Sequence, residues 1–262
     1  MDVLTADKLS VYMGDICLLR NISLNVESGE LLSIIGPNGA GKTTLMNALM
    51  SDVQKAYRVE GSIFFCGHDV KQLSLAKRAR QIACLPQTNL LNFPFSVEEV
   101  VSLGRTPHSS GKTIDAIIIS EALSALDIHH LKNCLYTRLS GGEKQRVQLA
   151  RVMAQIWREE SNDKRLLFLD EPTTSLDLGH QQQLMKIIRD FANQGVAIVM
   201  IVHDVNVAIN YSDKLLALSH SELVASGRPD KIITKQLLKT LYDLDAEIIT
   251  HPISSKPMII TT

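Results

Sequence analysis

The chain has few cysteines and no excess of charge of either sign. Its four cysteines stand far apart without a Cys-x-x-Cys pair, which argues against a zinc site or a disulfide framework and favours a reducing compartment. We expect all four to be packing residues. Because 27 basic residues are balanced by 28 acidic ones, the composition gives no support to a nucleic-acid binder, which usually carries a basic excess.

Long apolar segments are also missing. The longest apolar run, Val196–Val202, has seven residues, whereas a membrane-spanning helix needs roughly 20. The first residues include Asp2, Asp7 and Lys8 without a sustained apolar stretch, so no secretory signal is expected. Any role at a membrane is therefore expected to be carried out from outside its hydrocarbon core.

The length of 262 residues suits one large domain or one domain with an inserted lobe. In residues 1–35, apolar and polar residues alternate, which predicts short antiparallel strands. The apolar run Leu31–Ile35 predicts a strand that is buried on both faces. A helix is expected from Gly41 to about Met50, and residues 61–86 predict another strand pair.

From about Thr88 the pattern changes to helical spacing, so residues 88–150 are interpreted as a helical lobe inserted into a mixed sheet domain. The apolar strands at 165–170 and 196–202 flank an amphipathic helix, and strand–helix–strand units favour a parallel sheet. A hairpin at 214–227 and a short helix at 234–244 are expected to complete the chain.

The stretch "GPNGAGKTT" fits the pattern G-x-x-x-x-G-K-[ST], with a buried strand before it and a helix after it. Glycines let the backbone wrap around a phosphate chain, and the helix directs its positive end at the same phosphates. Lys42 is expected to reach the β- and γ-phosphates and the Thr43 hydroxyl to bind Mg²⁺. The nucleotide-binding residues predicted here are Gly36, Pro37, Asn38, Gly39, Ala40, Gly41, Lys42, Thr43 and Thr44.

The apolar run "RLLFLDEP" places Asp170 and Glu171 at the end of a strand, where ligands of parallel sheets bind. Asp170 is expected to hold Mg²⁺, and Glu171 to orient or deprotonate the attacking water. His203 ends the next strand and is predicted to contact the γ-phosphate. Gln87 is a weaker candidate, with an amide able to reach both Mg²⁺ and the attacking water.

A second helix start has the same character. In "RLSGGEKQRVQLARV", Ser140 and Glu143 form the pattern of a capping box. The glycines Gly141 and Gly142 fall in the first turn, although glycine weakens a helix by about 1 kcal/mol relative to alanine. They make sense if a negatively charged group presses against the bare backbone N–H groups.

Together these motifs resemble those of the ATP-binding cassette (ABC) family. The stretch "LSGGEKQRV" resembles the family's signature motif, and "GPNGAGKTT" resembles its phosphate loop. The remaining motifs of the family are matched, in the family's order, by "LLFLDEP", "SLD", Gln87 and His203. The resemblance covers nearly the whole chain. It implies an α/β fold with a P-loop NTPase core of mixed sheet, an antiparallel β subdomain and an inserted helical lobe. A single ABC ATPase domain is then expected over 1–262, with its core at 1–87 and 151–262 and the helical subdomain at 88–150.

The resemblance also implies ATP hydrolysis with Mg²⁺ by a head-to-tail homodimer. In such a dimer, Ser140, Gly141, Gly142 and Glu143 of one subunit face the ATP held by the other. Tyr12 stands where the family places an aromatic that stacks on adenine, although a tyrosine that merely fills a strand face is an alternative. Asp177, in the "SLD" motif, is added to the nucleotide site.

The expected role is the motor of a transporter, at the cytoplasmic face of the inner membrane and peripheral to it. Its partners would be two transmembrane permease subunits and, indirectly, a substrate-binding protein. The apolar stretch at 89–101, with Phe93, Pro94 and Phe95, suits permease docking, or these residues belong to the core. A soluble ATPase acting on nucleic acid or ribosomes is the distant alternative.

The cargo is inferred from resemblance alone. Several stretches, among them "SLDLGHQQQL" and "HPISSKPMIITT", resemble the branch that imports iron chelates, haem and vitamin B12. The polar insert "REESNDKR" lengthens the connection before the catalytic strand, as in haem-import subunits. Haem is therefore favoured, with a ferric siderophore or vitamin B12 as the alternative.

Overall fold

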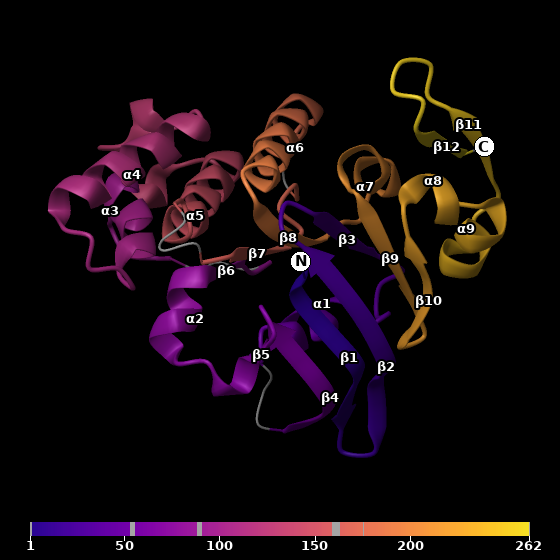
Figure 1. Cartoon of the computed structure of the whole chain (residues 1–262). Helices are drawn as coiled ribbons and strands as arrows, with labels where there is room; N and C mark the ends of the chain where they lie inside the picture. The colour runs from indigo at the N-terminus through magenta and orange to yellow at the C-terminus, as the bar shows by residue number, and fades with distance from the viewer. Residues whose placement is uncertain (1, 53–55, 88–90, 159–162, 175, 262) are drawn as a thin grey trace. The chain divides into compact units, whose positions relative to one another are not determined.

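The computed structural model describes residues 2–52, 56–87, 91–158, 163–174 and 176–261 (Figure 1). They form two compact units. Unit 1 comprises residues 1–72 and 197–262, and unit 2 comprises residues 73–196. Among the described residues, no helix is long and apolar enough to cross a membrane.

Unit 1 contains a four-stranded antiparallel sheet in the order β2-β1-β4-β5. Its strands are β1 (Asp2–Met13), β2 (Ile16–Glu27), β4 (Tyr57–Phe65) and β5 (His68–Asp69). The predicted antiparallel pairing of the first two strands is confirmed, but each has 12 residues, so the expectation of short strands was wrong. The register between β1 and β2 shifts at several bulges, so the two strands stay paired where the apolar alternation of the sequence is interrupted.

The second group of strands in unit 1 runs in the order β10-β9-β3-β8. It is formed by β3 (Leu31–Ile35), β8 (Val196–Ile201), β9 (Lys214–Ser219) and β10 (Glu222–Gly227). β3 pairs in parallel with β8 and β9, while β9 and β10 form the predicted hairpin. All residues of β3 and β8 are buried, which confirms the expected strand covered on both faces.

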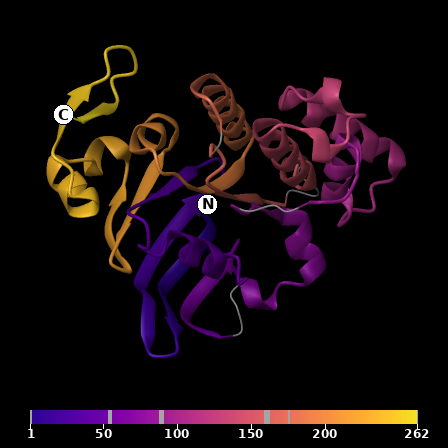
Figure 2. The same ribbon diagram turned by 180° about the vertical axis from the view of Figure 1, so that it is seen from behind.

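Short helices and a terminal hairpin complete the described part of unit 1. They are α1 (Lys42–Leu49), α7 (Val205–Tyr211), α8 (Pro229–Ile232), α9 (Lys235–Tyr242), β11 (Ala246–Thr250) and β12 (Pro257–Thr261). The predicted helices after the phosphate loop and near the C-terminus are both present. The expectation that the latter completes the chain was wrong, because β11 and β12 pair after it and lie beside α9 in both views (Figures 1 and 2).

Unit 2 contains most of the helices. Its elements are α2 (Leu75–Gln81), β6 (Ile82–Leu85), α3 (Val97–Ser102), α4 (Lys112–Ala125), α5 (Gly141–Gln155), β7 (Arg165–Asp170) and α6 (Leu178–Asn193). α5 packs against α3 and α4, so the helical character of the lobe after Thr88 is confirmed (Figure 2). β6 and β7 pair in parallel, from Ile82↔Leu166 to Leu85↔Leu169.

This last pairing corrects one expectation. β4 and β6, the strands that correspond to the two expected within 61–86, do not pair with each other, because β4 joins the antiparallel sheet of unit 1 and β6 joins β7. Apolar patterning identifies strands, but it does not identify their partners. Cys134 is exposed and is therefore not the packing residue that we expected.

Two further expectations are not tested by the fold. The boundaries of the compact units differ from the predicted core and helical subdomain, and those subdomain limits stay a prediction. In the polar insert at 158–165, residues 159–162 lie outside the described residues.

Candidate functional site

The loop at residues 36–41 joins β3 to α1 and has the backbone of a phosphate-binding loop. Gly36, Gly39 and Gly41 have φ values of 149°, 79° and 98°, which side-chain-bearing residues rarely adopt. A Cβ on Gly36 would overlap the carbonyl oxygen of Leu218, and one on Gly41 would lie 2.8 Å from Leu19 Cδ2. Both glycines are therefore required by close packing as well as by backbone conformation.

α1 begins directly after this loop, with Lys42, Thr43 and Thr44 in its first turn and no acidic residue there. The positive end of the helix is thus available to an anion. Lys42 is buried, and its Nζ donates hydrogen bonds to the carbonyl oxygens of Gly36 (2.8 Å) and Pro37 (3.0 Å). The loop therefore holds a buried ammonium group beside its own backbone, and the contact of this group with phosphate stays a prediction.

His203 follows β8 and lies in the same unit as the loop. The register pairs Ile34 of β3 with Ile201 of β8, so these two parallel strands end at the same edge. A cavity of about 650 Å³ is lined by His203, by residues 36–38 of the loop, and by side chains from β9 and α9. Ala40 is buried, and its N–H donates to Pro37 O at 3.2 Å.

Gln87 and Glu171 meet in unit 2. Gln87 Nε2 donates a hydrogen bond to Glu171 Oε2 at 3.0 Å, although the two residues are 84 positions apart. β6 and β7 are parallel neighbours, so their carboxyl ends deliver these side chains to one edge. Thr174 Oγ1 also donates to Glu171 Oε2, at 3.3 Å, which sequence reasoning missed.

The backbone of Glu171 is strained. Its φ of 53° lies in the left-handed region, which is costly for a residue with a side chain and is found preferentially at functional sites. Asp170, the last residue of β7, is buried beside it. The chain turns at Glu171 directly after the strand, so the Asp170 side chain is buried while the Glu171 side chain is partly exposed.

The start of α5 has the predicted capping box. The Ser140 N–H and Oγ both donate to Glu143 Oε2, at 2.8 and 2.7 Å, and Ser140 Oγ accepts from the Glu143 N–H. These hydrogen bonds from Ser140 hold the pKa of the Glu143 carboxyl below its ordinary value. The helix start is thus fixed by side chains, with no contribution needed from the two glycines.

Those glycines have no sufficient explanation within the chain. Neither has a positive φ, and a Cβ on Gly141 would meet no atom within 4 Å, while one on Gly142 would contact Leu176 at 3.1 Å. Their backbone N–H groups have no hydrogen-bond partner among the described residues. Since glycine costs helix stability, an external group that presses on this turn remains the best explanation.

We therefore expect the substitution Gly141→Asp to lower ATP turnover without lowering the stability of the fold. An acidic residue in the first turn favours the helix, so the unfolding temperature should stay equal or rise. ATP turnover should fall about 100-fold, because the new carboxylate would occupy and repel the place of the phosphates. Differential scanning fluorimetry and a phosphate-release assay measure the two quantities.

The matched control is Lys112→Asp, which places the same acid at the exposed first residue of α4. It should leave turnover unchanged. Normal turnover in Gly141→Asp would show that nothing needs to approach this helix start.

The roles of Asp177 and Tyr12 in the nucleotide site stay predictions. Asp177 caps α6, accepting from the His180 N–H at 2.8 Å, which lowers the pKa of its carboxyl. Ser175 of the same motif lies outside the described residues. The Arg58 guanidinium covers one face of the Tyr12 ring at 4.5 Å, so a single ring face is left for an adenine.

Known proteins match this chain along its length. The family model described as ABC transporter matches residues 19–174, which is more than half of the sequence. The chain belongs to the ABC transporter family. As a member, it is an ATPase with the ABC ATPase fold that the motifs predicted.

Two relatives are particularly similar. The chain is 41% identical over 258 residues to a hemin import ATP-binding protein, HmuV, of Pseudomonas fluorescens, covering 98% of this chain and 99% of the relative. It is also 41% identical to the HmuV protein of Gloeobacter violaceus, covering 98% and 94% of the two chains. Among solved structures, a chain from an inward-facing ABC transporter of metal-chelate type has a TM-score of 0.81 and 25% identity, covering 100% of this chain and 98% of that one.

Proposed function

We propose that the chain is the ATP-hydrolysing subunit of an importer that takes up hemin through separate membrane permease subunits. The observation that carries the catalytic part is the hydrogen bond between Gln87 and Glu171 at the ends of β6 and β7. The cargo rests on the full-length similarity to proteins named for hemin import. A ferric siderophore and vitamin B12 are the alternative cargoes.

In this proposal the phosphate loop and Lys42 hold the β- and γ-phosphates of ATP. Glu171 orients and deprotonates the attacking water, and Gln87 keeps its carboxylate in place. His203, at the cavity beside the loop, contacts the γ-phosphate. Phosphoryl transfer needs positioning and charge stabilisation, which these residues supply without a covalent intermediate.

The donor set fits Mg²⁺. Asp170 offers a carboxylate, Thr43 a hydroxyl and Gln87 an amide oxygen, since its Nε2 is the atom that donates to Glu171. All three are hard oxygen donors, which Mg²⁺ prefers together with phosphate oxygens and water. When bound, the ion would neutralise charge on the β- and γ-phosphates.

Two copies of the chain are proposed to share two ATP molecules. The helix start at Ser140–Glu143 carries open backbone N–H groups and a glycine with no intramolecular cause. In a head-to-tail homodimer this turn faces the ATP held by the other copy's phosphate loop. The γ-phosphate then favours the closed dimer, and its loss by hydrolysis opens it.

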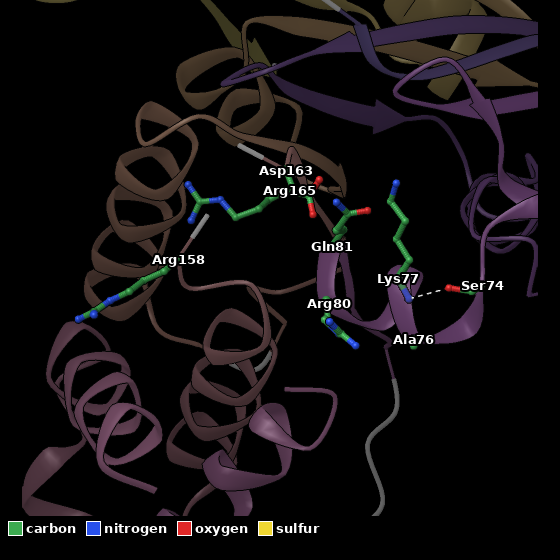
Figure 3. Close-up of a pocket in the computed structure, with 8 residues that line it drawn as sticks. All are labelled: Ser74, Ala76, Lys77, Arg80, Gln81, Arg158, Asp163 and Arg165. Atoms are coloured by element: carbon green, nitrogen blue, oxygen red, sulfur yellow. Dashed lines mark hydrogen bonds between the residues drawn. The ribbon is translucent and has the colours of Figure 1, made fainter. Parts of the chain in front are cut away.

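The permease is proposed to dock on unit 2 and to hold the chain at the cytoplasmic face of the membrane. Phe93 is 64% exposed and Leu75 is 80% exposed, so the alternative that Phe93 belongs to the core was wrong. A pocket of about 350 Å³ has Lys77 and Arg80 of α2 on one side, with Arg158 and Arg165 on the other (Figure 3). The exposed apolar and cationic side chains of α2, Leu75, Lys77 and Arg80, suit a permease segment that carries apolar and acidic residues.

Growth on hemin as the sole iron source tests this function. Cells without the chain should fail to grow on hemin yet grow on inorganic iron, and the wild-type chain should restore growth. Phe93→Asp should not restore growth while its purified protein still hydrolyses ATP, because only docking is removed. Growth is scored against the same strains supplied with a ferric siderophore.

Ile114→Asp is the matched control, since Ile114 is a 44% exposed apolar residue on α4 of the same unit. It should restore growth fully. Normal growth on hemin without the chain, combined with lost growth on the siderophore, would overturn the hemin assignment and leave the transporter ATPase.

A further inference from the structure

The last residue of α5 joins this helix to two other elements of unit 2 and has no role in the mechanism above. Gln155 Nε2 donates one hydrogen bond to Ala79 O of α2 at 2.7 Å and another to Ile82 O of β6 at 3.0 Å. Both acceptors are carbonyl oxygens, so the neighbours fix the orientation of the amide and use both of its N–H groups. The C-terminal end of α5 is therefore attached to α2 and to β6, against which it also packs (Figure 1).

The two carbonyl groups lie where one element passes into the next. Ala79 is in the last turn of α2, where a helix supplies no partner for its own carbonyl oxygens, and β6 begins at Ile82 directly after this helix. These oxygens therefore need a donor from elsewhere. The donor comes from a residue 73 positions after Ile82, so the bonds that complete α2 also link it to a distant helix.

The same end of α5 is fixed to the other helices of unit 2. Gly104 lies so close to α5 that a Cβ added to it would be 2.1 Å from Arg151 O. Arg105 Nη1 donates to Ala154 O at 2.9 Å, and its Nε forms an ion pair with Asp115 of α4 at 2.8 Å. α5 is thus held by backbone packing and by hydrogen bonds near its C-terminal end, and a shift of β6 reaches it through Gln155.

In the proposed mechanism, α5 and β6 serve different ATP molecules. α5 begins directly after Ser140, in the turn that faces the ATP held by the other copy. β6 ends two residues before Gln87, which serves the ATP held by the same copy. α5 has 15 residues and is therefore about 22 Å long, so it can carry a displacement from Gln155 to Ser140 as a rigid element.

We propose that Gln155 is a positioning residue that couples the two ATP sites of the dimer. It holds β6 to α5, so that the movement of Gln87 toward one ATP also moves the helix start that faces the other. The proposal rests on the proposed function, which supplies the shared sites. Its consequence is positive cooperativity, with a Hill coefficient for ATP hydrolysis above about 1.5, where two sites allow at most two.

The test compares Gln155→Met with the wild-type full-length chain. Methionine has a similar length but no donor, so both hydrogen bonds are lost. The Hill coefficient should fall from above about 1.5 to about 1, whereas the Kd for ADP, which binds one loop without closing the dimer, should change by less than about twofold. Initial rates of phosphate release over a range of ATP concentrations and equilibrium binding of ADP measure the two quantities.

Gln155→Lys is expected to restore cooperativity. An ammonium group at this position keeps donors for the two carbonyl oxygens, and a cation at the C-terminal end of a helix is favourable. Its Hill coefficient should again exceed about 1.5, in the same phosphate-release assay.

Gln148→Met is the matched control, because Gln148 lies on the same helix and its Nε2 donates to Tyr136 Oη at 3.0 Å, away from α2 and β6. Gln148 is 2% exposed, so the unfolding temperature of this variant should fall at least as far as that of Gln155→Met. Its Hill coefficient should nevertheless equal that of the wild type. A loss of stability alone is thereby distinguished from loss of the link to β6.

A wild-type Hill coefficient in Gln155→Met, or its equal loss in Gln148→Met, would contradict the proposal. A wild-type dimer with a Hill coefficient of one would contradict it as well and leave the proposed function standing. A wild-type chain that hydrolyses ATP at full rate as a monomer would overturn the shared sites of the proposed function and this role together.

Discussion

Glu171→Gln is expected to bind ATP with wild-type affinity and to hydrolyse it at least about 100-fold more slowly. The amide cannot take a proton from water, and general-base catalysis is worth about 100- to 10,000-fold in rate. The fold should persist, because glutamine has the same shape and its amide oxygen can still accept from Gln87 Nε2, now 3.0 Å from Glu171 Oε2. Single-turnover phosphate release and equilibrium nucleotide binding measure the two effects.

The same variant should accumulate as a dimer with ATP, since the closed state is no longer released by hydrolysis. Size-exclusion chromatography with light scattering measures this, with ADP as the comparison. Glu98→Gln is the matched control, because Glu98 lies exposed in the first turn of α3, and it should behave as the wild type. A native hydrolysis rate in Glu171→Gln would exclude Glu171 as the base.

Lys42→Ala should weaken ATP binding by about 100-fold and abolish transport. The buried ammonium group bonds to the carbonyl oxygens of Gly36 and Pro37, and it is the cation that the loop offers to the phosphates. A hydrogen bond to a charged group is worth about 1.5–3 kcal/mol, which corresponds to about 10- to 150-fold in affinity. Titration with a fluorescent ATP analogue gives the two dissociation constants.

Thermal unfolding provides an independent check on Lys42→Ala. ATP should raise the unfolding temperature of the wild type in proportion to the logarithm of its concentration over Kd, and should barely change that of the variant. Lys186→Ala is the control, since Lys186 is an exposed lysine of α6 and belongs to none of the nucleotide-binding motifs. Equal stabilisation of Lys42→Ala and wild type by ATP would contradict the role of Lys42.

Local sequence was a good guide wherever the structure depends on neighbouring residues. The loop at 36–41 follows a buried strand and precedes α1, and its glycines have the positive φ values that such a turn needs. The capping box of Ser140 and Glu143 forms as predicted, because its hydrogen bonds span only three residues. The buried strands β3, β7 and β8 were identified by their apolar runs.

Local sequence did not predict which distant segments pair, since strand partners depend on contacts that a local pattern does not encode. β6 was expected to pair within 61–86, but it joins β7, more than 80 positions later. The terminal hairpin of β11 and β12 was missed, because its outward side chains Ile249, Met258 and Ile260 are exposed and blur the apolar alternation.

The sequence by itself determined the family, the phosphate loop, and the identity of Asp170, Glu171, Gln87 and His203 as candidate residues, because these follow from short motifs in a fixed order. Only the tertiary structure decided that Gln87 and Glu171 share a hydrogen bond and that Arg58 covers Tyr12. The physical reason is distance along the chain: such contacts arise when strands and helices from separate segments pack together, and no local periodicity specifies which segments will meet.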